Sequence, residues 1–170
     1  MILKVSIKSQ LHALRELLII SMVYLGGMYF LYIKTEFDLF KILFLSTFIF
    51  YFLVLFLPVI ILHINYLNNN VYKNIVIEQN KLIIDNLVYK EDNIDKINIY
   101  ATRQHFSDSV GVSALPYNDY YYYLEVCLKD GRQINLSSLL DYKIDKIFKE
   151  NFKSINIIEK PSPFALLFIK

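Results

Sequence analysis

The chain has 170 residues, of which 55% are hydrophobic, and its formal net charge is +2. Five of the 18 basic residues and three of the 16 acidic residues precede Tyr66, so 13 of each remain in residues 66–170. Polyanion binding requires clustered cations, whereas these cations are interleaved with acids, so we predict no nucleic-acid partner. The single cysteine, Cys127, excludes an intrachain disulfide framework.

Two long apolar runs occupy the first third of the chain, at residues 17–33 and 42–62. Neither run contains a formally charged residue, and a helix needs about 20 residues to cross roughly 30 Å of hydrocarbon. We therefore expect two transmembrane helices within an N-terminal segment of residues 1–65. A cleavable signal peptide is not favoured, because bulky Tyr32 and Ile33 stand where a peptidase needs small residues.

Basic residues near the ends of the two runs predict the orientation of the helices. Lys4, Lys8 and Arg15 precede the first run, and Lys73 and Lys81 follow the second. The turn between the runs instead balances two lysines with two acidic residues. The positive-inside rule therefore predicts that both termini are cytoplasmic.

The runs themselves contain small and hydroxyl-bearing residues but no ionisable acid, base or histidine. Ion pathways and pumps usually need such a group, so the pattern indicates helix packing rather than conduction. Gly26 and Gly27 are the candidate packing residues, because small side chains let helix backbones approach each other. His63 follows the second run and is expected near the membrane interface.

Residues 66–170 are predicted to form a β-rich domain that begins with a hairpin. A two-residue loop at Gln79 and Asn80 places apolar residues opposite each other, and Asn80 tolerates the positive φ that this turn requires. The predicted pairs are Ile77 with Leu82 and Ile75 with Ile84. A third strand is expected at residues 94–102, followed by a long loop at residues 103–119.

A second hairpin is expected at residues 120–136. A three-residue loop, Lys129 to Gly131, keeps the apolar residues on one face and puts Gly131 in the left-handed position of a bulge. The predicted pairs are Val126 with Ile134 and Leu124 with Leu136. After it, Ser138 to Asp141 resembles a helix N-terminal capping box. The helix that follows is predicted to present one apolar face, formed by Ile144, Ile147 and Phe148.

This order of elements resembles the bacterial pleckstrin-homology-like (PH-like) fold, and residues 124–140 with the helix to Asn151 carry the resemblance. The predicted fold class is a membrane α-hairpin followed by an α+β domain, in which an antiparallel β-rich PH-like sheet is capped by one amphipathic helix. The resemblance implies a seven-stranded bent sheet in residues 66–170. It also implies a multi-pass protein of the bacterial inner membrane, with the domain on the cytoplasmic side.

The candidate ligand-binding residues are few and lie on a loop, a strand and a turn. They are Arg103, His105, Tyr121, Tyr123 and Arg132. Alternation directs Tyr121 and Tyr123 to the face opposite the core, where rings could stack on a ligand or partner. We favour packing for both tyrosines, either under the long loop or against the apolar tail of residues 161–169, and a solvated loop for His105.

Catalytic chemistry is not predicted. The three histidines are too dispersed in the sequence to indicate a metal site, and Cys127 fits a small strand hydrophobe better than a nucleophile. We therefore expect no enzyme activity, no metal and no cofactor.

Two functional hypotheses follow from this reading. The first is a membrane-tethered PH-like interaction module that binds a protein partner, or self-assembles, at the inner leaflet of the lipid bilayer. The alternative is a sensor whose β-rich domain binds a small-molecule ligand, such as a nucleotide signal, and whose oligomerisation perturbs the membrane. Two-helix effectors of bacterial defence systems have that outline. A sensor needs a concave pocket with convergent polar groups.

Overall fold

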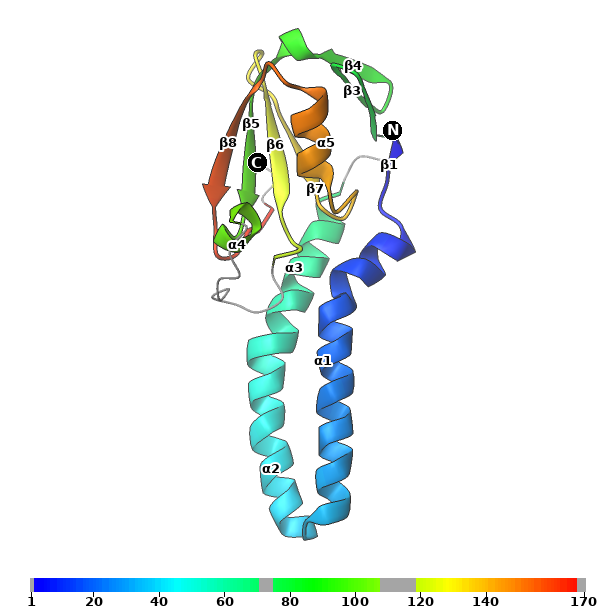
Figure 1. The fold of residues 1–170 in the computed structure, drawn as a ribbon, viewed down its shortest axis with the longest axis vertical. Coiled ribbons are helices and arrows are strands. Elements are labelled where there is room, and N and C mark those ends of the chain that lie inside the picture. The colour runs from blue at the N-terminus through cyan, green and yellow to red at the C-terminus, as the bar shows by residue number, and fades with distance from the viewer. Residues whose placement is uncertain (1, 71–74, 108–118, 168–170) are drawn as a thin grey trace.

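The computed structural model describes residues 2–70, 75–107 and 119–167. Its longest elements form a helical hairpin, in which α1 (Ile7–Lys34) is followed by α2 (Phe37–Phe50), a π-helical segment (Tyr51–Phe56) and α3 (Leu57–Asn68). Figure 1 shows that α2 and α3 form one long rod beside α1, and that this hairpin projects from one end of a β-rich domain.

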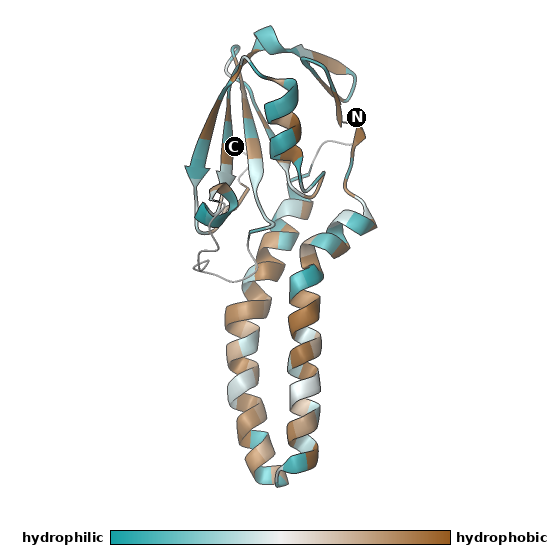
Figure 2. Cartoon of the chain, in the orientation of Figure 1, coloured by the Kyte–Doolittle hydropathy of each residue, from teal (hydrophilic) through white to brown (hydrophobic). Residues whose placement is uncertain are grey.

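The helices expose their apolar side chains instead of burying them. Only 6% of the most apolar window of the first helix and 11% of that of the second are buried inside the chain. A core helix of a water-soluble protein would be mostly buried, and so large an exposed apolar surface is unfavourable in water. Figure 2 shows hydrophobic residues along both rods. The expectation of two helices long and apolar enough to cross a membrane is confirmed.

Polar side chains join the two rods along their facing sides. The Tyr24 and Tyr51 rings stack with centroids 4.6 Å apart, and the Tyr51 hydroxyl lies 2.6 Å from the Ser21 hydroxyl. A Cβ added at Gly26 or Gly27 would meet no described atom within 4 Å. Tyrosine stacking thus joins the rods, whereas neither glycine is closely approached by the second rod, and the packing role of the two glycines stays a prediction.

Two four-stranded sheets are formed by the described residues. The first has the order β1 (Ile2–Leu3), β2 (Ile75–Glu78), β3 (Lys81–Ile84) and β4 (Leu87–Lys90), all antiparallel neighbours. Because β1 precedes α1 and pairs with β2, the helical hairpin is inserted between the first two strands of the domain. The expected boundary at residue 65 therefore differs from the structure, in which Leu3 pairs with Ile75 and is buried in the domain core.

The first predicted hairpin has the expected register, with Ile75 opposite Ile84 and Ile77 opposite Leu82. Asn80 has the positive φ of 59° that its turn requires. The strand that follows this hairpin, β4, was not predicted. A turn at Asp85 and Asn86, both with positive φ, returns the chain to pair β4 with β3.

The second sheet has the order β7 (Gln133–Ser137), β6 (Tyr123–Leu128), β5 (Ile94–Ala101) and β8 (Asn156–Pro161). Its hairpin has the predicted register, with Val126 opposite Ile134 and Leu124 opposite Leu136, and Gly131 has a φ of +88°. The strand β8 runs parallel to β5, which the sequence reading did not anticipate.

One helix, α5 (Ile144–Asn151), packs against the core between the sheets, and Ile144 and Phe148 are fully buried, as predicted. The predicted capping box is wrong. The Ser138 hydroxyl instead accepts a hydrogen bond from the backbone N–H of Tyr122 (3.3 Å), and the helix begins six residues later. Of the loop expected at residues 103–119, the described part begins with a short helix, α4 (Arg103–Phe106), and residues 108–118 lie outside the described residues.

Candidate functional site at the junction of helices and sheet

A second buried cluster joins the base of the helical hairpin to the β-rich domain. It combines apolar residues of α1 and α3 with residues that precede β6, follow β7 and end the described chain. Its buried members are Ala13, Leu17, Val59, Leu62, Tyr66, Tyr121, Leu139 and Leu167. Because this cluster is separate from the core between the sheets, we treat it as a distinct feature and name it the junction.

Hydrogen bonds inside the junction tie α3 to the end of the described chain. Asn65 contacts Leu167 twice, since its Oδ1 accepts the Leu167 N–H (2.8 Å) and its Nδ2 donates to the Leu167 carbonyl (3.0 Å). The Tyr66 hydroxyl donates to the carbonyl of Ala165 (2.8 Å). Asn69 adds a further bond to the Leu167 carbonyl (2.9 Å). The tail therefore clamps α3 through backbone and side-chain contacts.

Tyr121 lies at the centre of the junction and is 1% exposed. Its hydroxyl lies 3.1 Å from His63 Nδ1, and its ring contacts the Tyr66 ring edge-on, with centroids 5.4 Å apart. Leu167 of the tail belongs to the same cluster. The structure thus favours packing over ligand stacking for Tyr121, as the sequence reading did. Phe168 and Ile169 of the predicted tail lie outside the described residues.

Tyr123, the first residue of β6, lies on the face of the second sheet opposite the core between the sheets, where it is half-buried and packs against the junction. Its ring stacks on that of Tyr100 with centroids 4.7 Å apart, and burial raises its pKa to about 12, with further contributions from Tyr100 and Glu125. The Lys160 ammonium lies 4.9 Å from the centroid of the Tyr100 ring. Nearby, Cys127 is buried on strand β6, as expected for a small strand hydrophobe, and burial raises the pKa of its thiol.

A buried polar cluster connects α4 to α5 on the inner side of the second sheet. His105 Nε2 lies 3.3 Å from Asp145 Oδ2, and the Tyr122 hydroxyl donates to Asp145 Oδ1 (2.9 Å). Burial alone would raise the pKa of Asp145, yet the hydrogen bonds from His105 and Tyr122 and the His105 charge hold it below its ordinary value. Asp145 also lies in the first turn of α5, where the helix dipole favours a negative charge.

Replacing this carboxylate is expected to remove an acid-sensitive part of the stability. Because the folded pKa of Asp145 lies below the unfolded value of about 3.9, its contribution is present above about pH 4 and is lost as the pH falls further. Asp145→Asn should lower the free energy of unfolding by about 1–3 kcal/mol at pH 7 and by less at pH 3. Urea unfolding at both pH values checks this. Asp92→Asn, at an exposed position, is the matched control, and an equal loss at both pH values would contradict the expectation.

Arg132 lies in the turn of the second hairpin, at the end of the domain farthest from the helices. Its guanidinium lies 2.7 Å from Asp130 Oδ2 and 5.6 Å from the centroid of the Tyr89 ring. The hydrogen bond from Arg132 lowers the pKa of Asp130. A hollow of about 200 Å³ lies beside these residues, with Leu87 and Val88 of β4 along it.

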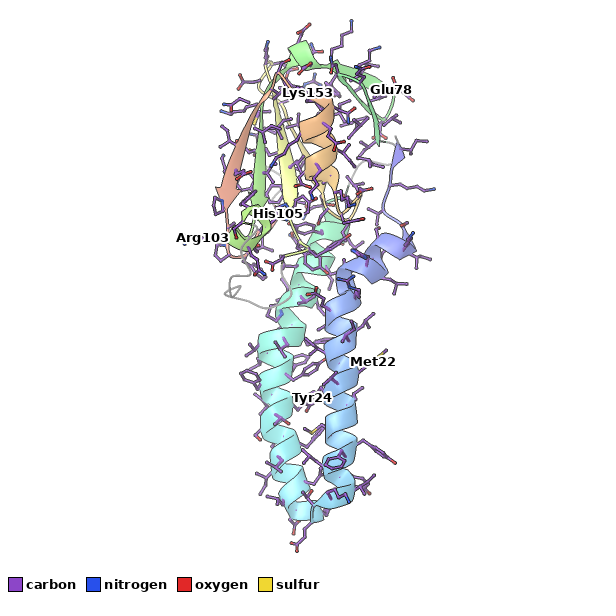
Figure 3. All side chains as sticks on the ribbon, viewed as in Figure 1. Met22, Tyr24, Glu78, Arg103, His105 and Lys153 are labelled. Carbon is purple, nitrogen blue, oxygen red and sulfur yellow. The ribbon has the colours of Figure 1, made fainter. Side chains whose placement is uncertain are left out.

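The five candidate ligand-binding residues therefore do not form one site. Figure 3 shows Arg103 and His105 together on α4, whereas Tyr121 lies in the junction with Tyr123 packed against it, and Arg132 lies at the distal turn. The sequence reading missed Asn65 and Asp145. No local sequence pattern marks either residue. Asn65 bonds Leu167, which is 102 positions away in the chain, and Asp145 bonds His105, which is 40 positions away.

Comparison with known proteins identifies the domain. A family model described as a PH domain matches residues 2–146. The chain belongs to this PH domain family. The match begins in β1 and continues through the helical hairpin to α5, so the hairpin lies within the matched region of the PH domain. No curated protein and no solved structure matches the chain. PH-like domains are generally interaction modules without enzyme activity, and they commonly bind proteins or lipids.

Proposed function

We propose that the protein is a membrane-tethered PH domain that presents an interaction surface to a protein partner, or to further copies of itself, at the inner leaflet of a bacterial inner membrane. The observation that carries the proposal is the junction. The domain is attached to the hairpin through strands on both sides of the insertion and through a buried cluster that includes Tyr121 and Leu167. A domain held in this way has a fixed orientation toward the bilayer, which lowers the entropic cost of binding a partner in the same membrane.

The sensor alternative has less support from the geometry. A ligand sensor needs convergent polar groups around a cavity. The candidate residues are instead dispersed, and Tyr121 has its hydroxyl and its ring engaged inside the junction. We therefore propose the interaction module, with residues 4–65 as its anchor and with Ile2 and Leu3 as part of the domain.

Cysteine labelling tests the membrane topology. In a Cys127→Ser background, Glu36→Cys places a thiol in the turn between the helices, and Asp130→Cys places one in the distal turn of the domain. In intact bacterial cells, a membrane-impermeant maleimide should label Glu36→Cys, and it should label Asp130→Cys only after permeabilisation. Labelling of both thiols in intact cells, or the reverse pattern, contradicts the proposed orientation.

Crosslinking in native membranes tests the interaction itself. The Asp130→Cys chain, treated with a short thiol-to-amine crosslinker, should give a discrete product that contains either a second copy or one protein partner. The matched control is Ser9→Cys, in the first turns of α1 and distant from the distal turn. If the Asp130→Cys chain forms no crosslinked product at any crosslinker concentration, the result contradicts the proposed interaction with a partner or a second copy.

A further inference from the structure

We propose that the first turns of α1, residues 7–15, lie in the headgroup layer of the bilayer and bind anionic phospholipid headgroups. This inference rests on the proposed function, because it requires that the hairpin spans a membrane. Beyond the membrane-spanning hairpin, it assigns the protein a second contact with lipid, made by an interfacial helix. It also specifies the class of lipid that this helix binds.

The direction of this segment differs from that of the hairpin. Figure 1 shows the first turns of α1 bent away from the rest of the helix, so that they run across the long axis of the hairpin beside the domain. If the hairpin spans the bilayer, these turns are oriented along the membrane surface. A helix with one apolar and one polar face commonly occupies that position.

The exposed apolar residues of the segment continue into the next turn of α1 as one stripe. Ile7 is 77% exposed, Leu11 is 55% exposed and Leu18 is 42% exposed, at spacings of four and seven residues that place them on one helix face. The other side of the helix is occupied by the domain, because Ala13 and Leu17 are buried in the junction. The stripe is thus directed away from the packed domain.

The stripe is continuous with the lipid-facing side of the first span. Met22, four residues after Leu18, is 71% exposed, and Figure 3 shows its side chain pointing away from the second helix. Tyr24, on the facing side, stacks on Tyr51 instead. A surface that contacts lipid at Met22 therefore extends along the same helix face to Leu11 and Ile7.

Basic residues lie beside the stripe in the part of α1 that is proposed to lie in the headgroup layer. Lys8 and Arg15 are exposed and lie next to the stripe on the helix surface, and the exposed Lys4 precedes the helix. One acidic residue, Glu16, lies among them, 3.6 Å from Arg15. Lysine and arginine side chains can extend their charged ends to the phosphates while their alkyl stems cover apolar surface. This arrangement of charge is complementary to a leaflet rich in anionic lipid.

Tryptophan fluorescence gives a direct test, because the chain has no Trp. Single-Trp variants of the full chain are reconstituted in vesicles of phosphatidylcholine and phosphatidylglycerol in equal parts, with and without brominated acyl chains. Ile7→Trp and Leu11→Trp report on the segment. Met22→Trp is the control within the span, and Val88→Trp, on β4 at the distal end of the domain, is the control in water.

We expect strong quenching of Met22→Trp, intermediate quenching and blue-shifted emission of Ile7→Trp and Leu11→Trp, and no quenching of Val88→Trp. If Met22→Trp is quenched while the two segment variants are not, the proposal of an interfacial helix is wrong, whereas the proposed membrane anchor is retained. A blue shift without quenching assigns the stripe to a protein contact, such as a second copy, and also overturns the proposal. If Met22→Trp itself is not quenched, the proposed function fails as well.

A charge variant tests the lipid class. Lys8→Gln combined with Arg15→Gln in the Leu11→Trp chain should reduce quenching in the mixed vesicles to the level measured in pure phosphatidylcholine. Quenching that is the same in both vesicle types, with or without the two basic residues, would overturn the preference for anionic headgroups.

Discussion

Val126→Asp is expected to unfold the PH domain. Val126 is fully buried on β6, between Ile97 of β5 and Ile134 of β7. Burying a carboxylate without a partner costs several kcal/mol or forces it to be protonated, and a domain of this size is stable by only about 5–15 kcal/mol. The loss of one buried apolar contact adds to that cost. The variant should lose the dispersed amide spectrum of a folded sheet and become sensitive to protease.

The matched control for this change is Gln133→Asp, on β7, where the side chain is exposed. Its stability should stay within about 0.5 kcal/mol of that of the unchanged chain, as is usual for surface substitutions. The comparison separates burial from charge, because both variants add one carboxylate to the same hairpin. A folded Val126→Asp domain with normal stability would show that β6 faces the other way.

The two hairpin registers could be predicted because their determinants are local. In each hairpin, alternating apolar residues and a turn residue with positive φ, Asn80 or Gly131, lie within a few positions of one another. A slip of one residue would move every apolar side chain to the wrong face, so the pattern admits one register. The apolar face of α5 has a similarly local origin, in the spacing of Ile144 and Phe148.

The strands that were missed lack such a pattern. The strand β1 has only two residues, too few to establish a period of two, and β4 exposes both Leu87 and Val88, so it does not alternate between buried and exposed positions. The strand β8 pairs with β5 in parallel, and its partner lies 60 positions earlier in the chain. Such contacts depend on the assembled fold, and no short stretch of sequence contains both partners.

Competition for hydrogen bonds explains the wrong helix start. Ser138 has the sequence of an N-cap, but it is fully buried and its hydroxyl satisfies the backbone N–H of Tyr122. A buried N–H without a partner is costly, so this tertiary contact overrides the local preference for a cap. The helix begins instead at Ile144, after a turn in which Asp141 accepts the Lys143 N–H.

The junction could be anticipated only in outline. The sequence indicates that Tyr121, Tyr123 and the apolar tail of residues 161–169 need burial, and the structure brings Tyr121 and Leu167 together. The sequence does not indicate that His63 and Asn65 of the second rod are the partners of Tyr121 and Leu167. Both polar residues follow the second apolar run, where polar residues at the membrane interface are common. Their role arises from the docking of the domain onto the hairpin.

Joining β1 directly to β2 is expected to yield a more stable domain than deleting everything before β2. In the joined chain, residues 4–74 are replaced by a short Asn-Gly turn, which is feasible because Leu3 and Ile75 are antiparallel partners. In the deleted chain, residues 1–74 are removed, so the core loses Leu3, which is 1% exposed. Loss of a buried leucine side chain costs about 2–5 kcal/mol, and the joined domain should be more stable by that amount.

Urea unfolding of both chains in mild detergent measures this difference, and the detergent covers the junction surface that the missing helices leave exposed. Leu3→Ala in the joined chain is the matched control, because it keeps the connection and removes only the side chain. Its stability should fall toward that of the deleted chain. Equal stability of the joined and deleted chains would show that Ile2 and Leu3 are not part of the PH domain. The helical hairpin would then be an N-terminal anchor that precedes the domain, instead of an insertion between its first two strands.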